Sequence, residues 1–304
     1  MKILGKKQSL AVTPRVYTLP DEARLQSGRA FMLESCSPLL GQVYKKIGKI
    51  LDSRVPVLFQ GENGVGKECL ARAVHHAGKQ RSGPFVVFPC QAASEEQLAK
   101  ELFGATDAHR GKLGEAEGGT VFLKNADALP PTLQLRILRL LQEKTICHPE
   151  SHATRKINLR LIASTRKNLD LEVTAGRFRQ DLYFRLTVYQ CDLPPLRERR
   201  EDIPKFVDHF ANHLAADIGR ELPIFTARSL AQLETHDWPE NIRELRRVVL
   251  YSIYSTVQRN KEERTIEQIK WADNNGHDQS PDDGTQSLTI KLQKEAREPV
   301  SCQV

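Results

Sequence analysis

The chain has little of what marks membrane, secreted or zinc-binding proteins. Nowhere in its 304 residues does an apolar run approach the roughly 18 residues that a membrane-spanning helix needs. The apolar part of the N-terminal MKILGKKQSLAVTPR is too short for a secretory signal. The cysteines, at 36, 69, 90, 147, 191 and 302, are scattered and include no Cys-x-x-Cys pair, which argues against a zinc site or a disulfide framework. These absences predict a cytoplasmic protein with reduced thiols and no membrane partner.

What is present is enough apolar sequence for a sizeable core and a modest excess of basic charge. Hydrophobic residues make up 39% of the chain, and the length favours about two domains. The net charge of +7 comes from 45 Lys and Arg against 38 Asp and Glu, which permits an anionic partner without identifying one. Arginines crowd residues 177–200 and 243–247. They indicate either a solvated basic face or phosphate chemistry.

The order of apolar segments predicts an α/β core followed by a helical domain. Strands expected at 55–59, 85–88, 120–123, 158–164 and 187–193 alternate with helices expected at 66–77, 94–102 and 131–143, after a first helix within 37–51. Strands buried on both faces with helical crossovers predict a three-layer fold with a parallel sheet. We expect this core to span 31–195 and an all-helical domain, without strands between its helices at 203–216, 226–235 and 240–257, to span 196–272. Residues 1–30 are expected to be a loosely ordered lead-in, and the polar residues 273–304 a flexible tail.

A phosphate-binding loop is predicted at GENGVGKE, which directly follows the first expected strand and opens a helix. The backbone N–H groups of such a loop close around phosphate oxygens, and the helix N-terminus adds partial positive charge. Lys67 would reach the outer phosphates, and the general pattern places Ser or Thr after it where this chain has Glu68. The bland alternative is a glycine turn without a ligand. The predicted binding residues are Gly61, Glu62, Asn63, Gly64, Val65, Gly66, Lys67 and Glu68.

The sequence segments around this loop resemble the AAA+ domain of the sigma-54-dependent transcription activators, the bacterial enhancer-binding proteins. GENGVGKE is similar to the family's GESGTGKE, in which glutamate after the lysine is normal. The resemblance continues, in the family's order and over about residues 33–272, through ELFG (101–104), GKLGEAEGGTVFL (111–123), LRILRLLQE (135–143), LRLIAST (159–165), GRFRQDLYFRL (176–186), LPPLRERREDI (193–203) and WPENIREL (238–245).

The resemblance implies a P-loop AAA+ core with a helical lid, assembled into rings that hold ATP between neighbouring subunits and remodel sigma-54 polymerase. Arg179 and Arg185 match the family's arginines that reach into the neighbouring subunit's site. A fixed positive fork of this kind stabilises charge that develops in phosphoryl transfer. Arg243 matches the lid arginine that senses nucleotide. The alternative for each arginine is a surface salt bridge.

The catalytic strand departs from the family pattern. Where the family reads GTLFLDEI, with an aspartate for Mg²⁺ and a glutamate for the attacking water, this chain has Lys124 and Asn125. An ammonium cannot hold Mg²⁺, and a neutral amide has no useful basicity near pH 7, so Mg²⁺ binding is doubtful and no catalytic residue is intact. Pro89 replaces the asparagine of the family's N-C-A-A, and Arg166 stands at the sensor position after the strand expected at 158–164.

The output elements of the family are also missing from the sequence. Only ATDAHR lies between Gly104 and Gly111, where the family inserts the GAFTGA loop that touches sigma-54. After Trp271 the sequence shows no pair of short apolar-periodic helices, so no DNA-binding domain is expected there. Contact with sigma-54 is therefore not expected of this chain.

We interpret the chain as an ATP-binding pseudo-ATPase involved in transcription regulation, acting as a homo-oligomer or as a hetero-oligomer with an intact AAA+ paralogue. One alternative is a residual ATPase that uses a displaced acid such as Asp127 or Glu117. Another is a transcription regulator that acts without sigma-54, through bound DNA or protein. A degenerating gene product with no selected role also stays open.

Overall fold

The computed structural model describes residues 17–18, 34–91, 94–104, 110–147, 154–218, 222–259, 265–269 and 271. The elements up to the end of the sheet are β1 (Tyr17–Thr18), β2 (Glu34–Ser35), α1 (Pro38–Gly48), β3 (Val57–Gln60), α2 (Lys67–Ala77), η3 (Lys79–Ser82), β4 (Phe85–Pro89), α3 (Glu95–Phe103), α4 (Gly111–Glu115), β5 (Thr120–Lys124), η4 (Ala126–Ala128), α5 (Pro131–Glu143), β6 (Thr145–Cys147), β7 (Thr154–Lys156), β8 (Arg160–Thr165), α6 (Leu169–Thr174), α7 (Gln180–Leu186), η5 (Thr187–Tyr189) and β9 (Gln190–Asp192). They are followed by η6 (Leu196–Glu198), η7 (Arg200–Asp202), α8 (Ile203–Ile218), β10 (Ile224–Phe225), α9 (Ala227–Thr235), α10 (Asn241–Arg259) and β11 (Thr265–Ile266).

The central sheet is parallel and has the strand order β4-β5-β8-β3-β9. Each of its strands coincides with one of the predicted strands, although the last one begins only at Gln190, after a 3₁₀ turn. Because the strands run the same way, the loops after β3, β4, β5 and β8 all open at one edge. That edge is where an open parallel sheet presents its ligand site.

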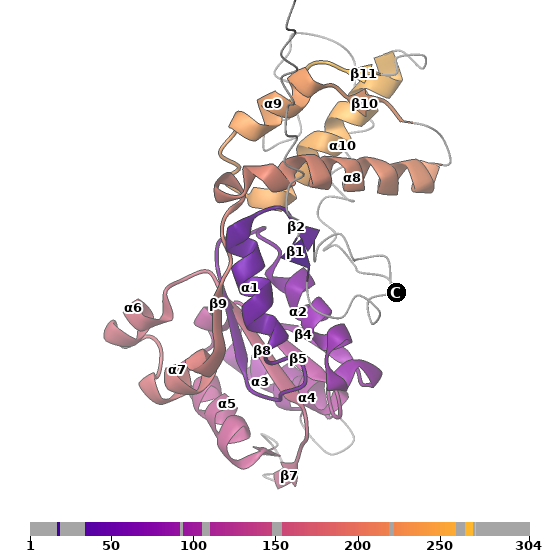
Figure 1. Ribbon diagram of the computed structural model, residues 1–304. Helices are drawn as coiled ribbons and strands as arrows, with labels where there is room; N and C mark the ends of the chain where they lie inside the picture. The colour runs from indigo at the N-terminus through magenta and orange to yellow at the C-terminus, as the bar shows by residue number, and fades with distance from the viewer. Residues whose placement is uncertain are drawn as a thin grey trace, which may run out of the picture.

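Helices cover both faces of the sheet, which confirms the predicted three-layer fold (Figure 1). On β5, Val121 and Leu123 pack into a core with α3, α4, α5 and α7, whereas Phe122 points the other way, into a core with α1 and α2. This alternation is the period-2 pattern of a strand buried on both faces. Helix α3 is capped by Ser94, whose side chain accepts a hydrogen bond from the Gln97 amide, and it ends at Gly104 with a φ of 78°.

The lid consists of α8, α9 and α10, grouped at one end of the molecule beyond the sheet (Figure 1). Its helices enclose Trp238, Leu245 and Val249, all fully buried. The expectation that no strand lies between these helices was wrong, because β10 pairs in parallel with β11. Two-residue strands are too short to show a period-2 pattern in the sequence.

Several elements were not predicted from the sequence. They include α4, α6, α7 and the antiparallel hairpin of β6 and β7. Tyr17–Thr18, within the expected lead-in, pairs antiparallel with Glu34–Ser35. The rest of residues 1–30, the expected tail at 273–304 and residues 105–109 of the shortened loop lie outside the described residues. Across the described part of the chain, every helix is too short or too polar to cross a membrane.

Candidate nucleotide-binding site

The loop between β3 and α2 has the backbone geometry of a phosphate cradle. Gly61, Gly64 and Gly66 have positive φ values of 154°, 77° and 102°, and α2 starts directly after Gly66. At Gly64 no side chain fits, because a Cβ atom there would lie 2.0 Å from the Glu240 carbonyl oxygen. The loop therefore needs glycine for its conformation and for the close approach of the lid.

Lys67 is folded back onto this loop. Its Nζ donates hydrogen bonds to the carbonyl oxygens of Gly61 at 2.6 Å and Glu62 at 2.7 Å. Burial lowers the pKa of Lys67 to about 8; the carboxylate of Asp127 works in the opposite direction, and three nearby cations, Arg243, Lys124 and Arg166, add to the lowering. The structure thus brings the predicted Arg243, Lys124 and Arg166 together around Lys67. An anion bound in the loop would relieve the repulsion among these cations.

The tip of β5 carries an ion pair where the family pattern has a metal-binding acid. Lys124 Nζ lies 3.1 Å from Glu68 Oε2, so the altered residue at the end of β5 pairs with the glutamate that follows the P-loop lysine. Asn125 adopts the left-handed conformation, with a φ of 59°. Its amide N–H donates to Ser164 Oγ at 3.2 Å, and its side-chain Nδ2 lies 3.5 Å from Gln91 Oε1.

The neighbouring strands carry the two other altered positions. Pro89 is in register with Lys124, and the amide of Cys90 donates to the Lys124 carbonyl oxygen at 2.9 Å. Arg166 follows β8 directly and is exposed. The sheet therefore brings Pro89, Lys124 and Arg166 to one edge, which their separation along the chain does not reveal.

These residues do not fit Mg²⁺. The donors at the two family positions are an ammonium and an amide, and the described residues include no group of three or more His, Cys, Asp or Glu side chains that could hold a metal. Asp127 is the acid that acts on Lys67, and its Oδ1 accepts a hydrogen bond from Thr165 Oγ1 at 3.1 Å. Glu117 precedes β5 at the opposite edge of the sheet and pairs with Arg155 at 2.8 Å. Of the two displaced acids considered, only Asp127 lies on the nucleotide side.

The lid is joined to the phosphate loop by hydrogen bonds. Arg197 forms a bidentate ion pair with Glu62, at 2.7 and 3.0 Å. Asn241 Nδ2 donates to Glu62 Oε2 at 3.0 Å and to the Asn63 carbonyl oxygen at 2.9 Å. The buried Arg199 donates to the Val65 carbonyl oxygen at 2.7 Å. The lid therefore contacts directly the loop that would hold phosphate.

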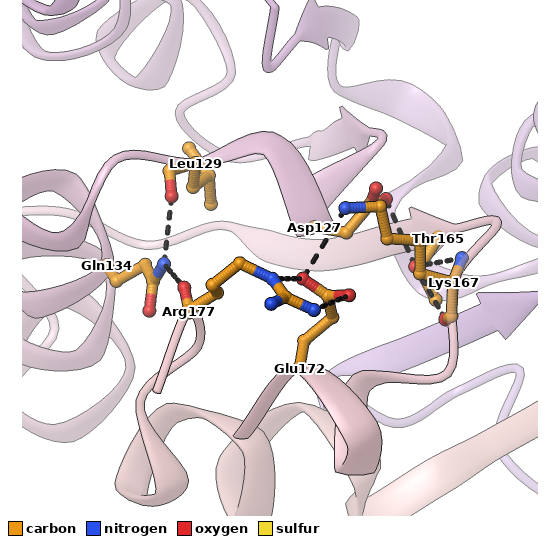
Figure 2. Close-up of polar contacts among 7 residues, drawn as sticks. All are labelled: Asp127, Leu129, Gln134, Thr165, Lys167, Glu172 and Arg177. Atoms are coloured by element: carbon orange, nitrogen blue, oxygen red, sulfur yellow. Dashed lines mark hydrogen bonds and ion pairs between the residues drawn. The ribbon is translucent and has the colours of Figure 1, made fainter. Parts of the chain in front are cut away.

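A polar network around Glu172 and Gln134 holds Arg177, two residues before Arg179 (Figure 2). Arg177 and Lys167 both point at the buried Glu172, at 2.7 and 3.4 Å, and the Arg177 hydrogen bonds are the main reason that the pKa of Glu172 is lowered to about 2. Gln134 on α5 donates to the Arg177 carbonyl oxygen at 3.0 Å and accepts from the Arg179 amide at 2.8 Å. Gln134 thus fixes the backbone from the Arg177 carbonyl group to the Arg179 amide.

The two predicted arginine fingers lie at the two ends of α7. Arg179 precedes the helix and forms a bidentate ion pair with Asp181, at 2.7 and 3.0 Å. Arg185 is exposed in the last turn. Burial is the main cause that lowers the pKa of Lys144, and the charge of Arg185 adds to this lowering. Helix α7 packs on α5, so both arginines face outward from the core.

Comparison with known families decides the identity of this fold and loop. Residues 33–192, more than half of the chain, match the family described as the sigma-54 interaction domain. The chain belongs to the sigma-54 interaction domain family. Residues 197–281 of this sigma-54 interaction domain protein match the family described as the AAA+ ATPase lid domain.

Its relatives are transcriptional regulators by name. The transcriptional regulatory protein ZraR of Salmonella typhimurium is 38% identical over 243 residues, which cover 77% of this chain and 55% of ZraR. The nitrogen assimilation regulatory protein NtrX of Azorhizobium caulinodans is 40% identical over 215 residues, covering 69% of this chain and 47% of NtrX. The crystal structure of NtrX from Brucella abortus in complex with ATP is 31% identical, with a TM-score of 0.71 over 77% of this chain and 55% of that one. The chain thus spans about half the length of the curated relatives it matches.

Sequence reasoning missed the polar contacts that tie the lid of this sigma-54 interaction domain to its phosphate loop. Arg197 and Asn241 lie in the motifs LPPLRERREDI and WPENIREL, but nothing in their spacing shows that both side chains donate hydrogen bonds to Glu62. The Glu172 network was missed as well. Its only sequence signal is the i, i+5 separation of Glu172 and Arg177, which is too common to single out.

Proposed function

We propose that this protein binds ATP at the loop of residues 61–68 without hydrolysing it at a useful rate, and that it regulates transcription by assembling with AAA+ subunits. The observation that carries the proposal is the ion pair of Lys124 with Glu68 beside an intact phosphate loop. Binding geometry is kept while the chemical positions at the tip of β5 are changed.

Nucleotide binding is supported by the loop and by its relatives. The positive φ values of the glycines and the start of α2 at Lys67 match the requirements of a phosphate cradle. NtrX from Brucella abortus, which shares this fold, has been crystallised with ATP and with ADP.

Loss of hydrolysis is supported by the chemistry of residues 124 and 125. A positioned general base contributes a factor of about 10² to 10⁴, and neither an ammonium nor an amide can act as one. Pro89, in register with Lys124, has no side-chain amide to couple nucleotide state to this strand. The altered residues therefore occupy adjoining strands of one edge.

Assembly is supported by the surface around α6 and α7, where three large apolar side chains are exposed. Leu171 is 63%, Phe184 60% and Val188 61% exposed, close in sequence to Arg179 and Arg185. Exposed apolar side chains on and beside the elements that carry the two arginines agree with a protein contact at this part of the surface. We infer a homo-oligomer, or a hetero-oligomer in which Arg179 and Arg185 complete the site of an intact paralogue.

The proposed output differs from that of an activator. The six residues between Gly104 and Gly111, ATDAHR, do not contain the GAFTGA motif, so we infer that the chain does not contact sigma-54 itself. It would instead tune a ring of intact subunits, either by supplying arginines or by interrupting the series of contact loops. Free cysteines, such as the buried Cys90 and Cys191, agree with a reducing cytoplasm.

The test measures binding, turnover and assembly on the same protein. A fluorescent ATP analogue should bind to the wild-type chain and not to Lys67→Ala. Phosphate release with Mg²⁺ should equal the Lys67→Ala background, and light scattering should show a larger particle when an intact AAA+ relative is added. Turnover within tenfold of that relative, or no binding at all, would refute the proposal.

A residual ATPase that uses Asp127 is the second candidate. It is favoured by the position of Asp127, whose charge acts on Lys67 and whose carboxylate is oriented by Thr165. This candidate requires phosphate release above the Lys67→Ala background, abolished by Asp127→Asn. If Asp127→Asn leaves that release unchanged, Asp127 is not the catalytic acid.

A further inference from the structure

The ammonium of Lys124 stands in the neighbourhood that the P-loop pattern reserves for Mg²⁺. In that pattern the side chain directly after the P-loop lysine reaches the metal. Here this side chain is Glu68, and its Oε2 lies 3.1 Å from Lys124 Nζ. A protein cation therefore occupies the region where the metal would be expected.

The charge balance of the site agrees with this substitution. Two acids at positions 124 and 125 together with Mg²⁺ would sum to zero, whereas Lys124 and Asn125 sum to one positive charge without any metal. Arg166 and Arg243 add further positive charge around Lys67, and Asp127 is the opposing carboxylate. The site is thus already suited to a polyanion before a metal arrives.

Lys124 can turn toward a phosphate without leaving an orphaned carboxylate. Its side chain is 37% exposed, so it is not fixed by packing. Glu68 has a second partner, because its Oε1 lies 3.1 Å from Arg72 Nη2. When Lys124 moves, Glu68 stays paired through Arg72.

We propose that Lys124 is a built-in counter-ion for the outer phosphates, so that the protein binds nucleoside triphosphates in their metal-free form. The three donors of its ammonium match phosphate oxygens, and its single charge replaces part of what Mg²⁺ supplies. The inference rests on the proposed nucleotide binding and adds the form of the ligand. It also predicts that added Mg²⁺ competes for ATP in solution instead of assisting its binding.

The experiment compares ATP binding by calorimetry in EDTA and in Mg²⁺ for the wild type and Lys124→Gln, with Lys112→Gln as the matched control. Lys112 is an exposed lysine paired with Glu115, away from the phosphate loop. We expect the wild type and the control to bind in EDTA at least as tightly as in Mg²⁺. Lys124→Gln should bind at least about tenfold more weakly in EDTA, since a hydrogen bond to a charged group is worth about that factor or more.

A third variant separates the charge from the fold. Lys124→Asp should restore a preference for Mg²⁺-ATP, and its thermal unfolding should show that it is folded. Wild-type binding that requires Mg²⁺, or Lys124→Gln binding that equals the wild type in EDTA, would overturn the inference and leave the proposed function standing. No binding of ATP in either buffer would overturn both.

Discussion

Replacing Gly64 by alanine should push the start of α10 away from the phosphate loop. The residue has a φ of 77°, and an added Cβ would lie 2.0 Å from the Glu240 carbonyl oxygen and 3.3 Å from Arg243 Cβ. Ordinary contacts are near 3.4 Å or longer, and the closest atom belongs to the backbone, so the lid itself has to move. The change costs stability through both backbone strain and lost contacts.

The expected magnitude comes from two sources. Alanine in the left-handed conformation costs about 1 kcal/mol. Moving the start of α10 away from the loop also breaks the two Asn241 Nδ2 hydrogen bonds to Glu62 and Asn63 and the bond from the Ile242 amide to the Gly64 carbonyl oxygen. At about 1 kcal/mol each, these add about 3 kcal/mol, for a total of about 4 kcal/mol.

Gly118→Ala is a matched control for this prediction. Gly118 has nearly the same φ, 76°, but nothing lies within 4 Å of its added Cβ, so only the strain of about 1 kcal/mol applies. Urea unfolding followed by tryptophan fluorescence reports on the lid, because Trp238 and Trp271 both belong to it. Equal losses of stability at Gly64 and Gly118 would show that the lid does not rest on the loop as described.

Three further predictions concern pH, the arginine segment and repair of the acids. ATP affinity should fall about tenfold per pH unit above about pH 8, because the free protein then loses the Lys67 proton that the phosphates require. The Lys67→Arg variant should bind ATP without this pH dependence. The free energy of unfolding should decline as pH falls from 4.5 to about 2, because the Glu172 carboxylate stabilises the fold above its unfolded pKa and is protonated in the folded protein only near a pKa of about 2. Urea unfolding of Glu172→Gln should show a smaller loss of stability over this pH range. Lys124→Asp combined with Asn125→Glu should not restore sigma-54-dependent transcription in a reporter assay, because the contact loop is still missing.

The sequence predicted the sheet well because its strands are buried on both faces. Val121, Phe122 and Leu123 form an unbroken apolar run, and such runs between helical segments point to one kind of fold. The short elements escaped because their patterns span too few residues: β10 has two residues and α6 has six. Pairing far along the chain, rather than local pattern, decides whether such segments become ordered.

For the site, the sequence identified residues but not their partnerships. The motif placed Lys67 in the loop and the resemblance singled out Lys124, but neither indicated that Lys124 pairs with Glu68 across 56 positions. Side-chain direction at the end of a strand depends on its neighbours, here β4 and β8. The same limit hid the contact of Asn241 with Glu62, since it joins two domains.

The ion pair of Arg179 with Asp181 has a consequence for exchange between molecules. In the isolated chain the guanidinium already holds a carboxylate in a bidentate grip, two residues away. An acceptor on another molecule must therefore displace the Asp181 carboxylate before it can bind the Arg179 guanidinium. In the assembly proposed above, Asp181 would occupy the Arg179 guanidinium until an anion of another molecule displaces it, and a phosphate, with more negative charge than one carboxylate, would be the stronger competitor.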